Sequence, residues 1–394
     1  MFSSLATPKA DPILSLTVAF KEDPRPNKID LGIGVYRNSD GVTPIMSAVR
    51  QAMLNLAETQ TTKAYVGLAG NEIFNQAMID LLLSGTAAHA RARAIQTPGA
   101  SGALRMLGDL IASARPNATV WISRPSYVNH QPVMEAAGLS VREYPYFDVD
   151  TKTVDEAAML AQIAKLGPDD VLLLHGCCHN PTGGDISLDA WRQITELALN
   201  NGFLPFVDIA YQGFGDGLME DAAGLRLLAD AVPEMVISTS CSKNFGLYRE
   251  RTGAAILIGE TDETTAKARG RILELARGTY TMPPDHGAAI VADILTNAAL
   301  KAEWLTELAA MNQRINRLRE QLTLTFRELS DSQRFDYFSQ HRGMFSVTGL
   351  SAEQIAALRD DHGIYVVGGG RVNVAGMSEK DIPAVAKAFL AVGA

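Results

Sequence analysis

The chain has 394 residues, of which 47% are hydrophobic and 20% charged, a composition typical of a globular protein with room for two domains. Its 35 basic and 44 acidic residues give a formal net charge of -9, which argues against nucleic acid as a partner. The start "MFSSLATPKADPIL" lacks the pattern of a signal peptide, and no apolar segment approaches the roughly 20 residues of a membrane span. We therefore expect a cytoplasmic protein without a membrane partner.

The three cysteines are Cys177, Cys178 and Cys241. Two adjacent cysteines and a distant third fit neither a disulfide framework nor a C-x-x-C zinc site. We expect them to be buried thiols in a reducing compartment, and we expect no metal.

Short apolar runs in the middle of the chain have the character of strands buried on both faces. They are residues 119–123, 171–175, 203–208, 235–240 and 253–259. Helical stretches lie between most of them; "SLDAWRQITELALNNG" opens on Ser187 or Asp189 as its N-cap and stops at Gly202. This alternation predicts an α/β protein with a mainly parallel sheet covered by helices on both sides.

The pattern changes after about residue 260. Residues 297–329 form a long, nearly uninterrupted helical pattern with apolar residues at three- and four-residue spacing. The short segments "GMFSVTG", "SAEQIAALRDDHG" and "IYVVGGGRVNVAG" follow it. They predict a second, smaller α+β domain.

Polar residues follow three of the predicted strands. Asn180 lies in "GCCHNPTGG", Asp208 is followed by Tyr211 in "DIAYQGF", and Lys243 comes directly after "MVISTSCS". Each has an ordinary explanation, since "NPTG" is a good turn, an aspartate can cap a helix and a lysine can be exposed. Because ligands of open α/β sheets bind beyond the carboxyl ends of the strands, the three together indicate a ligand site.

Pyridoxal phosphate needs residues of these types. A lysine amine holds the cofactor aldehyde covalently and later moves the α-proton, while a carboxylate keeps the pyridine nitrogen protonated. A phenol and an amide can hydrogen-bond the ring oxygen. The phosphate needs an anion site, for which the helix start in "TPGASGALRM" (97–106), Ser240 and Arg251 are candidates.

The motifs "HNPTGG", "DIAYQGF", "SCSKNFGLYRER" and "GRVNVAG" occur in an order that resembles the class I aminotransferases of pyridoxal-phosphate fold type I. The similarity is to the aspartate and aromatic amino acid aminotransferase branch and covers essentially the whole chain. It implies a mainly parallel seven-stranded sheet between helices, with a smaller α+β domain. The implied divisions are an N-terminal arm (1–10), a large cofactor domain (43–310) and a small domain (11–42 with 311–394).

The resemblance also implies roles for the residues around the cofactor ring. Lys243 would be the covalent lysine and proton carrier, and Asp208 the partner of the pyridine nitrogen. Tyr211 and Asn180 would hydrogen-bond the ring oxygen, with Asn180 also near the substrate. His130 would support Asp208 from beneath the ring.

A second group of implied residues binds the phosphate. Ser101, Ser240 and Arg251 would hold it, together with backbone amides near Ala100. Tyr65 would reach the phosphate of the other subunit in a homodimer, so that the two active sites are shared across the interface.

The implied substrate residues are Arg371, Arg277 and Gly34. Arg371 would bind the α-carboxylate as a bidentate pair, and Arg277 would reach across the dimer to a distal carboxylate. Gly34 would let the backbone approach the substrate. Two flanking arginines suit a dicarboxylic amino acid.

Three residues depart from the family pattern. Tyr127 stands where a tryptophan usually stacks on the cofactor, so it is expected to stack on the ring and contact the substrate with less area. Gly369 replaces a common serine, and Met282 replaces an asparagine near Arg277. A less polar distal pocket would favour aromatic side chains alongside dicarboxylates.

The resemblance therefore implies an aminotransferase that moves the amino group of aspartate, phenylalanine or tyrosine to 2-oxoglutarate by a ping-pong mechanism. Another enzyme of the same fold, catalysing β-elimination or decarboxylation, is the nearest alternative. A non-catalytic ligand sensor fused to a DNA-binding domain is a further alternative, which the absence of a helix-turn-helix segment disfavours.

Overall fold

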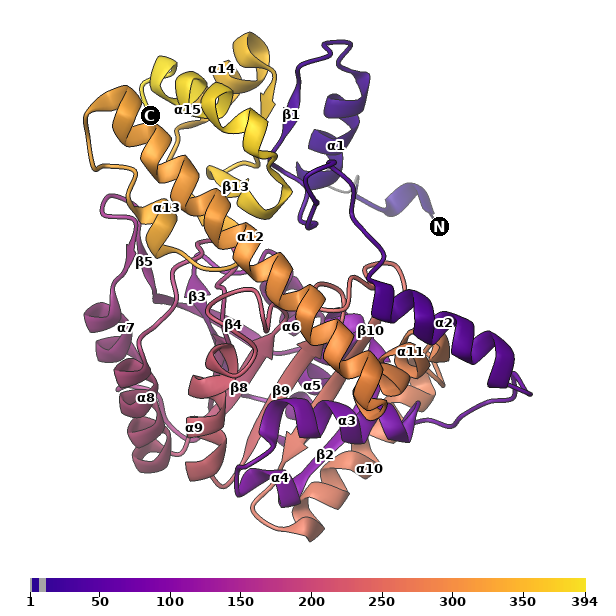
Figure 1. Ribbon diagram of the computed structural model, residues 1–394. Helices are drawn as coiled ribbons and strands as arrows, with labels where there is room; N and C mark the ends of the chain where they lie inside the picture. The colour runs from indigo at the N-terminus through magenta and orange to yellow at the C-terminus, as the bar shows by residue number, and fades with distance from the viewer. Residues whose placement is uncertain (1, 7–11) are drawn as a thin grey trace.

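A seven-stranded sheet is the centre of the computed structural model, which describes residues 2–6 and 12–394 (Figure 1). Its strand order is β2-β10-β9-β8-β7-β3-β4. The strands are β2 (Ala92–Pro98), β3 (Thr119–Arg124), β4 (Ser140–Pro145), β7 (Asp170–His175), β8 (Leu204–Ile209), β9 (Met235–Ser240) and β10 (Thr252–Ile258). Only β10 runs antiparallel to its neighbours, so the prediction of a mainly parallel α/β sheet is confirmed.

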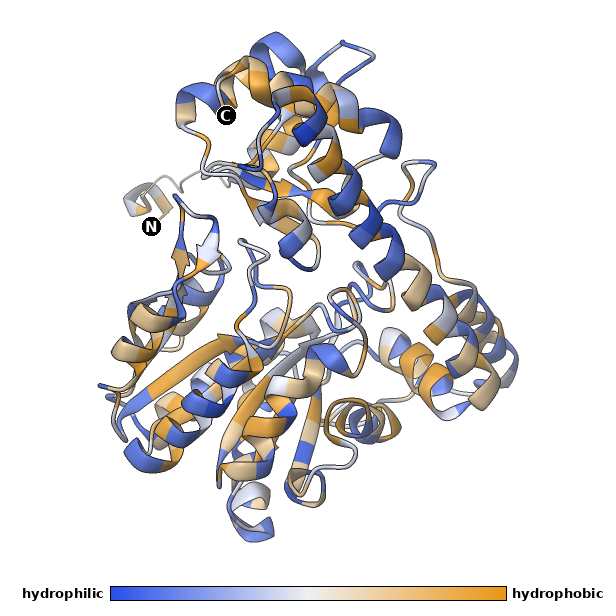
Figure 2. Cartoon of the chain, turned by 60° about the vertical axis from the view of Figure 1, so that its left-hand side comes forward, coloured by the Kyte–Doolittle hydropathy of each residue, from blue (hydrophilic) through white to orange (hydrophobic). Residues whose placement is uncertain are grey.

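Helices cover both faces of this sheet (Figures 1 and 2). Because successive strand residues point to opposite faces, Val171 and Leu173 of β7 belong to one hydrophobic cluster and Leu172 and Leu174 to another. The helices of the first cluster are α5 (Gly99–Ala114), α6 (His130–Ala136) and α10 (Asp262–Thr279). Those of the second include α2 (Ser47–Thr59), α3 (Glu72–Leu83), α7 (Glu156–Ile163), α8 (Leu188–Asn201), α9 (Ala223–Ala231) and α11 (Asp285–Thr296).

The predicted elements of the large sheet match the structure closely. All five predicted strands lie within one residue of the observed bounds. Helix α8 begins after Ser187, whose side chain accepts a hydrogen bond from the backbone N–H of Ala190, and ends at Gly202 with φ +75°. That positive φ is easily reached only by a residue without a Cβ.

Helix α12 (Ala298–Ser330) is 33 residues long and leads from the sheet to a second group of elements (Figure 1). There β1 (Ile29–Asp30) pairs with β12 (Ile364–Tyr365), and β11 (Phe345–Val347) pairs with β13 (Arg371–Asn373). The remaining elements there are α1 (Pro12–Glu22), α13 (Tyr337–Gln340), α14 (Ala352–His362) and α15 (Ile382–Ala391). Short elements elsewhere are α4 (Ala88–Arg91), β5 (Phe147–Asp148) and β6 (Thr153–Val154).

This second group has its own hydrophobic cluster. It joins Leu31 to side chains between Leu318 and Phe389, which is the combination of early and late residues that the predicted small domain contains. The domain boundaries themselves remain predictions. Half of the predicted N-terminal arm, residues 1–10, lies outside the described residues, which include 2–6 of it.

Two further expectations concern the chain as a whole. Within residues 2–6 and 12–394, the structure contains no helix with the length and apolarity that crossing a membrane requires. Cys177, Cys178 and Cys241 are all buried and none is in a disulfide.

Candidate active site

Three parallel neighbouring strands of the sheet end side by side. β7, β8 and β9 are paired in register, so that His175 lies opposite Asp208, and Asp208 opposite Ser238. A cavity of about 210 Å³ opens beyond these ends. The predicted residues that line it are Gly34, Ala100, Ser101, Tyr127, Asn180, Asp208, Tyr211, Ser240, Lys243 and Arg251. The structure therefore brings most of the predicted site residues to one place.

Asp208 is buried at the base of this cavity. Its Oδ2 lies 3.1 Å from His130 Nε2, and His130 Nδ1 lies 2.9 Å from Ser126 Oγ. Burial raises the pKa of Asp208, but hydrogen bonding and nearby charge, His130 foremost, together outweigh burial and bring the pKa below its ordinary value. His130 thus donates from Nε2 to an ionised carboxylate, and its Nδ1 lies within hydrogen-bond distance of the Ser126 hydroxyl. Asp208 Oδ1 is buried with no hydrogen-bond partner among the described residues.

Lys243 follows β9 and is partly buried. Its Nζ lies 4.7 Å from the centroid of the Tyr211 ring. Burial lowers the pKa of Lys243 to about 8, although the negative charge of Asp208 acts in the opposite direction. Asn180 Nδ2 donates to the Tyr211 hydroxyl at 3.3 Å, and burial raises the pKa of that phenol, which keeps its proton. The site therefore places an amine of lowered pKa beside a neutral phenol.

The start of α5 forms another wall of the cavity. Its N-cap residue, Pro98, provides no side-chain cap, so the first backbone N–H groups of the helix lack the usual acceptor. Gly99 has φ +69°, and a Cβ there would lie 2.6 Å from Arg251 Nη2. Only glycine leaves this room, which places a guanidinium directly over the helix start. Ser101 and Ser240 supply hydroxyls at the same cavity. This combination of donors is suited to an anion.

Arg371 lies on β13, outside the residues that line the cavity but electrostatically coupled to Tyr211 and Tyr127. It is buried, and burial lowers the pKa of its guanidinium. One amino group donates to the Gly32 carbonyl at 2.9 Å, while Nε is buried without a partner in the described part of the chain. The guanidinium carbon lies 4.4 Å from the centroid of the Phe345 ring.

Gly34 lies close to that same ring. A Cβ at this position would lie 3.2 Å from Phe345 Cζ. A side chain there would therefore push against the same phenyl ring that the Arg371 guanidinium packs on.

Tyr65 and Arg277 do not join the cavity. Tyr65 is 89% exposed, and Arg277 is exposed near the end of α10. Over residues 2–6 and 12–394, Arg277 forms no ion pair, and its predicted role across a dimer stays a prediction. Met282 lies near Tyr65 in space, since the backbone N–H of Val66 approaches its Sδ at 3.2 Å.

Gly369, the third departure from the family pattern, has φ +80°. This backbone conformation favours glycine over the serine that is common there.

Several lining residues were not singled out from the sequence. His175, the last residue of β7, was inside a predicted strand, and its place opposite Asp208 could have been inferred from strand ends alone. Burial lowers its pKa to about 3, so its ring is neutral. Ser242 and Tyr248 lie within the quoted motif around Lys243. The Tyr248 hydroxyl accepts from the backbone N–H of Tyr36 at 3.0 Å, a tertiary contact that the sequence does not reveal.

One cluster of buried potential metal ligands occurs in the part of the chain that the structure describes: Cys177, Cys178 and Asp221. The two Asp221 oxygens accept backbone N–H groups of the loop from Gly213 to Gly217. Burial also raises the pKa of the Cys178 thiol, which disfavours the thiolate that a metal needs. We assign no metal to this cluster.

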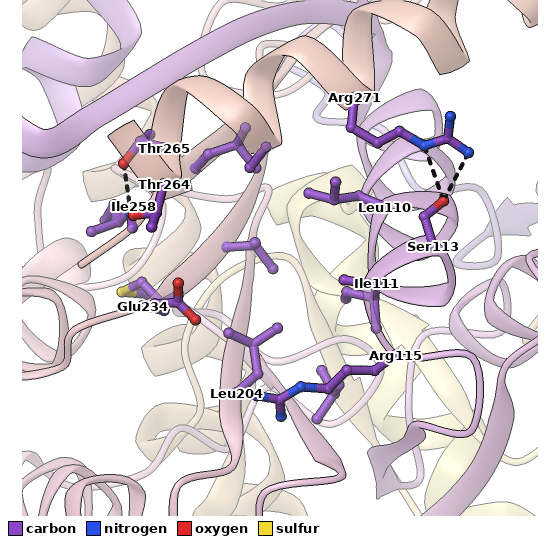
Figure 3. A pocket seen from close by; sticks show the side chains of 17 residues that line it. Leu110, Ile111, Ser113, Arg115, Leu204, Glu234, Ile258, Thr264, Thr265 and Arg271 are labelled. Carbon is purple, nitrogen blue, oxygen red and sulfur yellow. Dashed lines mark hydrogen bonds between the residues drawn. The ribbon is translucent and has the colours of Figure 1, made fainter. Parts of the chain in front are cut away.

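A larger cavity of about 490 Å³ lies at the opposite edge of the sheet (Figure 3). Its lining comes from the amino ends of β7, β8 and β9, the end of α5 and the first half of α10, and is mainly aliphatic. At its rim Arg271 donates to Ser113 Oγ at 3.2 Å. None of the predicted site residues lies among its described lining residues. The larger of the two cavities is therefore not the candidate active site.

Comparison with known proteins decides the family. A family model described as "Aminotransferase class I and II" matches residues 26–389. This chain belongs to the class I and II aminotransferase family. An aromatic-amino-acid aminotransferase of Paracoccus denitrificans is 46% identical over 393 residues, with 100% of both chains covered. An aspartate aminotransferase of Escherichia coli K12 is 44% identical over 395 residues, again with 100% of both covered.

Solved structures agree with this aminotransferase assignment. A structure of an aromatic amino acid aminotransferase with 3-indolebutyric acid has a TM-score of 0.97 and 45% identity, and 100% of each chain is covered. An aromatic-amino-acid aminotransferase from Burkholderia pseudomallei, described as covalently bound to pyridoxal phosphate, has a TM-score of 0.97 and 38% identity over 100% of this chain and 99% of that one. The aspartate and aromatic branch is thus confirmed. The elimination, decarboxylation and sensor alternatives are not favoured, since these relatives are aminotransferases.

Proposed function

We propose that this aminotransferase uses pyridoxal phosphate to move the amino group of aspartate and of phenylalanine or tyrosine to 2-oxoglutarate. The proposal depends on one observation: Asp208, whose Oδ1 has no hydrogen-bond partner among the described residues, and the amine of Lys243 line the same cavity. When bound, pyridoxal phosphate supplies a ring that accepts electrons from the substrate α-carbon. A buried carboxylate with a free oxygen is suited to hold a protonated ring nitrogen, so the residues fit the cofactor.

Lys243 is the group that moves the proton at the substrate α-carbon. With a pKa of about 8, about a tenth of such amines are neutral at pH 7, roughly 300 times the fraction of an ordinary lysine. That neutral fraction lets the amine act as a base near physiological pH. His130 is a positioning residue, because its hydrogen bond fixes Asp208 Oδ2 and leaves Oδ1 for the cofactor.

The start of α5 is the proposed phosphate site. The uncapped N–H groups near Ala100, the hydroxyls of Ser101 and Ser240, and the Arg251 guanidinium together offer neutral and charged donors. In the proposed homodimer, Tyr65 of a second copy completes this site. The 89% exposure of Tyr65 is consistent with a contact of that kind.

Arg371 is the proposed ligand of the substrate α-carboxylate. One amino group is used by Gly32, and the unpartnered Nε leaves a donor free for a planar carboxylate. Asn180, which donates to the Tyr211 hydroxyl, would also hydrogen-bond the bound substrate. Gly34 keeps the approach open, because any side chain there would meet Phe345.

The choice of substrate depends on the distal side of the cavity. Arg277 of a second copy would bind a distal carboxylate and so favour aspartate. Met282, and Tyr127 in place of the family's larger tryptophan, would instead make room for an apolar ring. Support for use of both classes comes from the relatives, which are named aromatic-amino-acid and aspartate aminotransferases at similar identity. We further propose that the protein acts in the cytoplasm as a homodimer.

The test is an amino-transfer assay with 2-oxoglutarate, comparing wild type with Lys243→Ala and Lys243→Arg. We expect both variants to lose at least about a hundredfold in kcat, since neither offers a neutral amine at this position. Release of pyruvate or ammonia without amino transfer would refute the proposed reaction.

Specificity is tested separately by kcat/KM for aspartate, phenylalanine and tyrosine in wild type and Arg277→Ala. The proposal expects a larger loss for aspartate than for the aromatic substrates. If aspartate loses no more than they do, Arg277 is not the distal ligand.

A further inference from the structure

Phe345, the first residue of β11, lies between Arg371 and Tyr211. The carbon of the Arg371 guanidinium lies over the Phe345 ring, 4.4 Å from its centroid. On another side the Tyr211 ring meets Phe345 edge-on, with the centroids 6.0 Å apart and the planes at 85°. The Tyr211 ring is in turn the one that Lys243 Nζ approaches to 4.7 Å. Two neighbouring aromatic rings therefore separate the Arg371 guanidinium from the Lys243 amine.

The backbone of Phe345 is fixed from two sides. Its carbonyl accepts a hydrogen bond from Arg319 Nη2 at 2.7 Å. The loop that follows Asn180 packs directly against the same carbonyl oxygen, because a Cβ on Gly183 would overlap it. β11 also pairs with β13, where Phe345 lies opposite Asn373. The buried Phe345 ring therefore has little freedom to move away from the guanidinium.

The Arg371 guanidinium has few other contacts that could fix its orientation. Within the described part of the chain its side chain makes one hydrogen bond, from Nη2 to the Gly32 carbonyl at 2.9 Å. Its Nε is buried without a partner among those residues. A guanidinium over the face of an aromatic ring is attracted by the negative charge of the ring electrons. The Phe345 ring is therefore a main support of a buried cation that must keep donors free for a ligand.

We propose that Phe345 is a positioning residue for the substrate α-carboxylate, because its ring holds the Arg371 guanidinium in the orientation that leaves Nε free to donate. This inference rests on the proposed function, in which Arg371 binds that carboxylate. Every amino-acid and 2-oxo acid substrate carries the same carboxylate, so the contribution of Phe345 is equal for all of them. It differs in this respect from Arg277, whose proposed role is to favour aspartate over aromatic substrates.

The consequence is a change in KM. An arginine that binds the carboxylate equally in the ground state and the transition state affects KM and leaves kcat nearly unchanged. A contact between a desolvated cation and an aromatic ring is strong enough to alter an affinity about fivefold. We therefore expect Phe345→Leu, which keeps an apolar side chain but removes the ring, to raise KM about fivefold for aspartate, phenylalanine and 2-oxoglutarate alike.

A sharper test keeps the shape of the ring and changes only its electrons. Phenylalanine analogues with one, two or three ring fluorines in place of Phe345 withdraw negative charge from the ring face step by step. For the cofactor-loaded enzyme, we would measure KM and kcat for amino transfer, and by calorimetry the dissociation constant of 3-phenylpropionate. This probe has the carboxylate and ring of phenylalanine but no amino group, so it binds without reacting. The matched control makes the same changes at Phe389, which is buried in the cluster around Leu318.

We expect KM and the dissociation constant of 3-phenylpropionate to rise with each added fluorine, by about fivefold in total, while kcat changes less than about twofold. The ratio of kcat/KM between aspartate and phenylalanine should stay constant, and the Phe389 variants should bind like wild type. If Phe345→Leu does not fold, the fluorinated variants still decide, because fluorine is nearly as small as hydrogen.

Two results would overturn the inference. One is a KM that rises in Phe345→Leu but does not respond to fluorination, which would mean that the ring only fills space. The other is unchanged binding in every Phe345 variant. A wild type that shows no amino transfer would instead refute the proposed function, and the inference with it.

Discussion

The lowered pKa of Lys243 predicts a specific dependence of stability on pH. Burial brings the pKa of this amine from 10.5 to about 8 in the folded protein, while the unfolded chain keeps the ordinary value. Between these two values the unfolded chain holds a proton that the folded chain has released. Stability must therefore rise with pH across this window, because the unfolded state binds more protons.

The size of the effect follows from the two pKa values. Between about pH 7 and about pH 9.5, wild type should gain about 2 kcal/mol of unfolding free energy relative to Lys243→Met, which has no proton to release. The assay is urea unfolding of the cofactor-free proteins at several pH values in this range. Taking the difference between the two proteins removes the titration of other groups. Lys387→Met, at an exposed position of α15, controls for the loss of one lysine.

A difference that stays constant to within about 0.5 kcal/mol would refute the reasoning. It would mean that water reaches the charged amine in the folded protein, so that burial does not lower the pKa of Lys243. The raised neutral fraction inferred for Lys243 near pH 7 would then be absent.

Three further changes have outcomes that the structure determines. Arg371→Lys should lower kcat/KM for all amino-acid substrates by about tenfold or more, mainly through KM, because a lysine cannot offer two parallel donors; an unchanged KM would contradict this. Gly270→Ala in α10 should raise stability by about 0.5–1 kcal/mol in thermal unfolding, because the added Cβ would meet open space. Gly253→Ala should instead lower stability by about 2 kcal/mol in the same assay, because its Cβ would lie 2.6 Å from the Thr239 carbonyl oxygen. Arg319→Met should cost about 3 kcal/mol, measured by urea unfolding, because the buried guanidinium donates to several backbone carbonyls of the segment before and within β11; a loss below about 1 kcal/mol would show that water replaces it.

Much of the large sheet could be predicted because its central strands are continuous apolar runs. β7, β8 and β9 are buried on both faces, and such runs have few alternatives. The edge strands β2 and β4 were not predicted individually. β4 exposes Arg142 and Glu143 and pairs with one neighbour only, so its apolar signal is weak.

The candidate site divides in the same way. Asn180, Asp208 and Lys243 could be brought together from the sequence, because the carboxyl ends of parallel strands meet at one edge. Gly34 and Arg371 come from opposite ends of the chain, and only the family resemblance related them to the site. Phe345, which separates the two, was not predicted, since its position depends on packing between distant segments.

Helix α12 takes part in both hydrophobic cores. Trp304 and Ile315 pack in the cluster of the large sheet, and Leu318 and Phe326 pack in the second cluster. At 1.5 Å per residue, its 33 residues make a rod of about 50 Å. Both hydrophobic cores include side chains of this one helix. Bending of this helix would therefore move β13, which carries Arg371, relative to β9, which Lys243 follows. The relative position of these two groups thus depends on the shape of one helix.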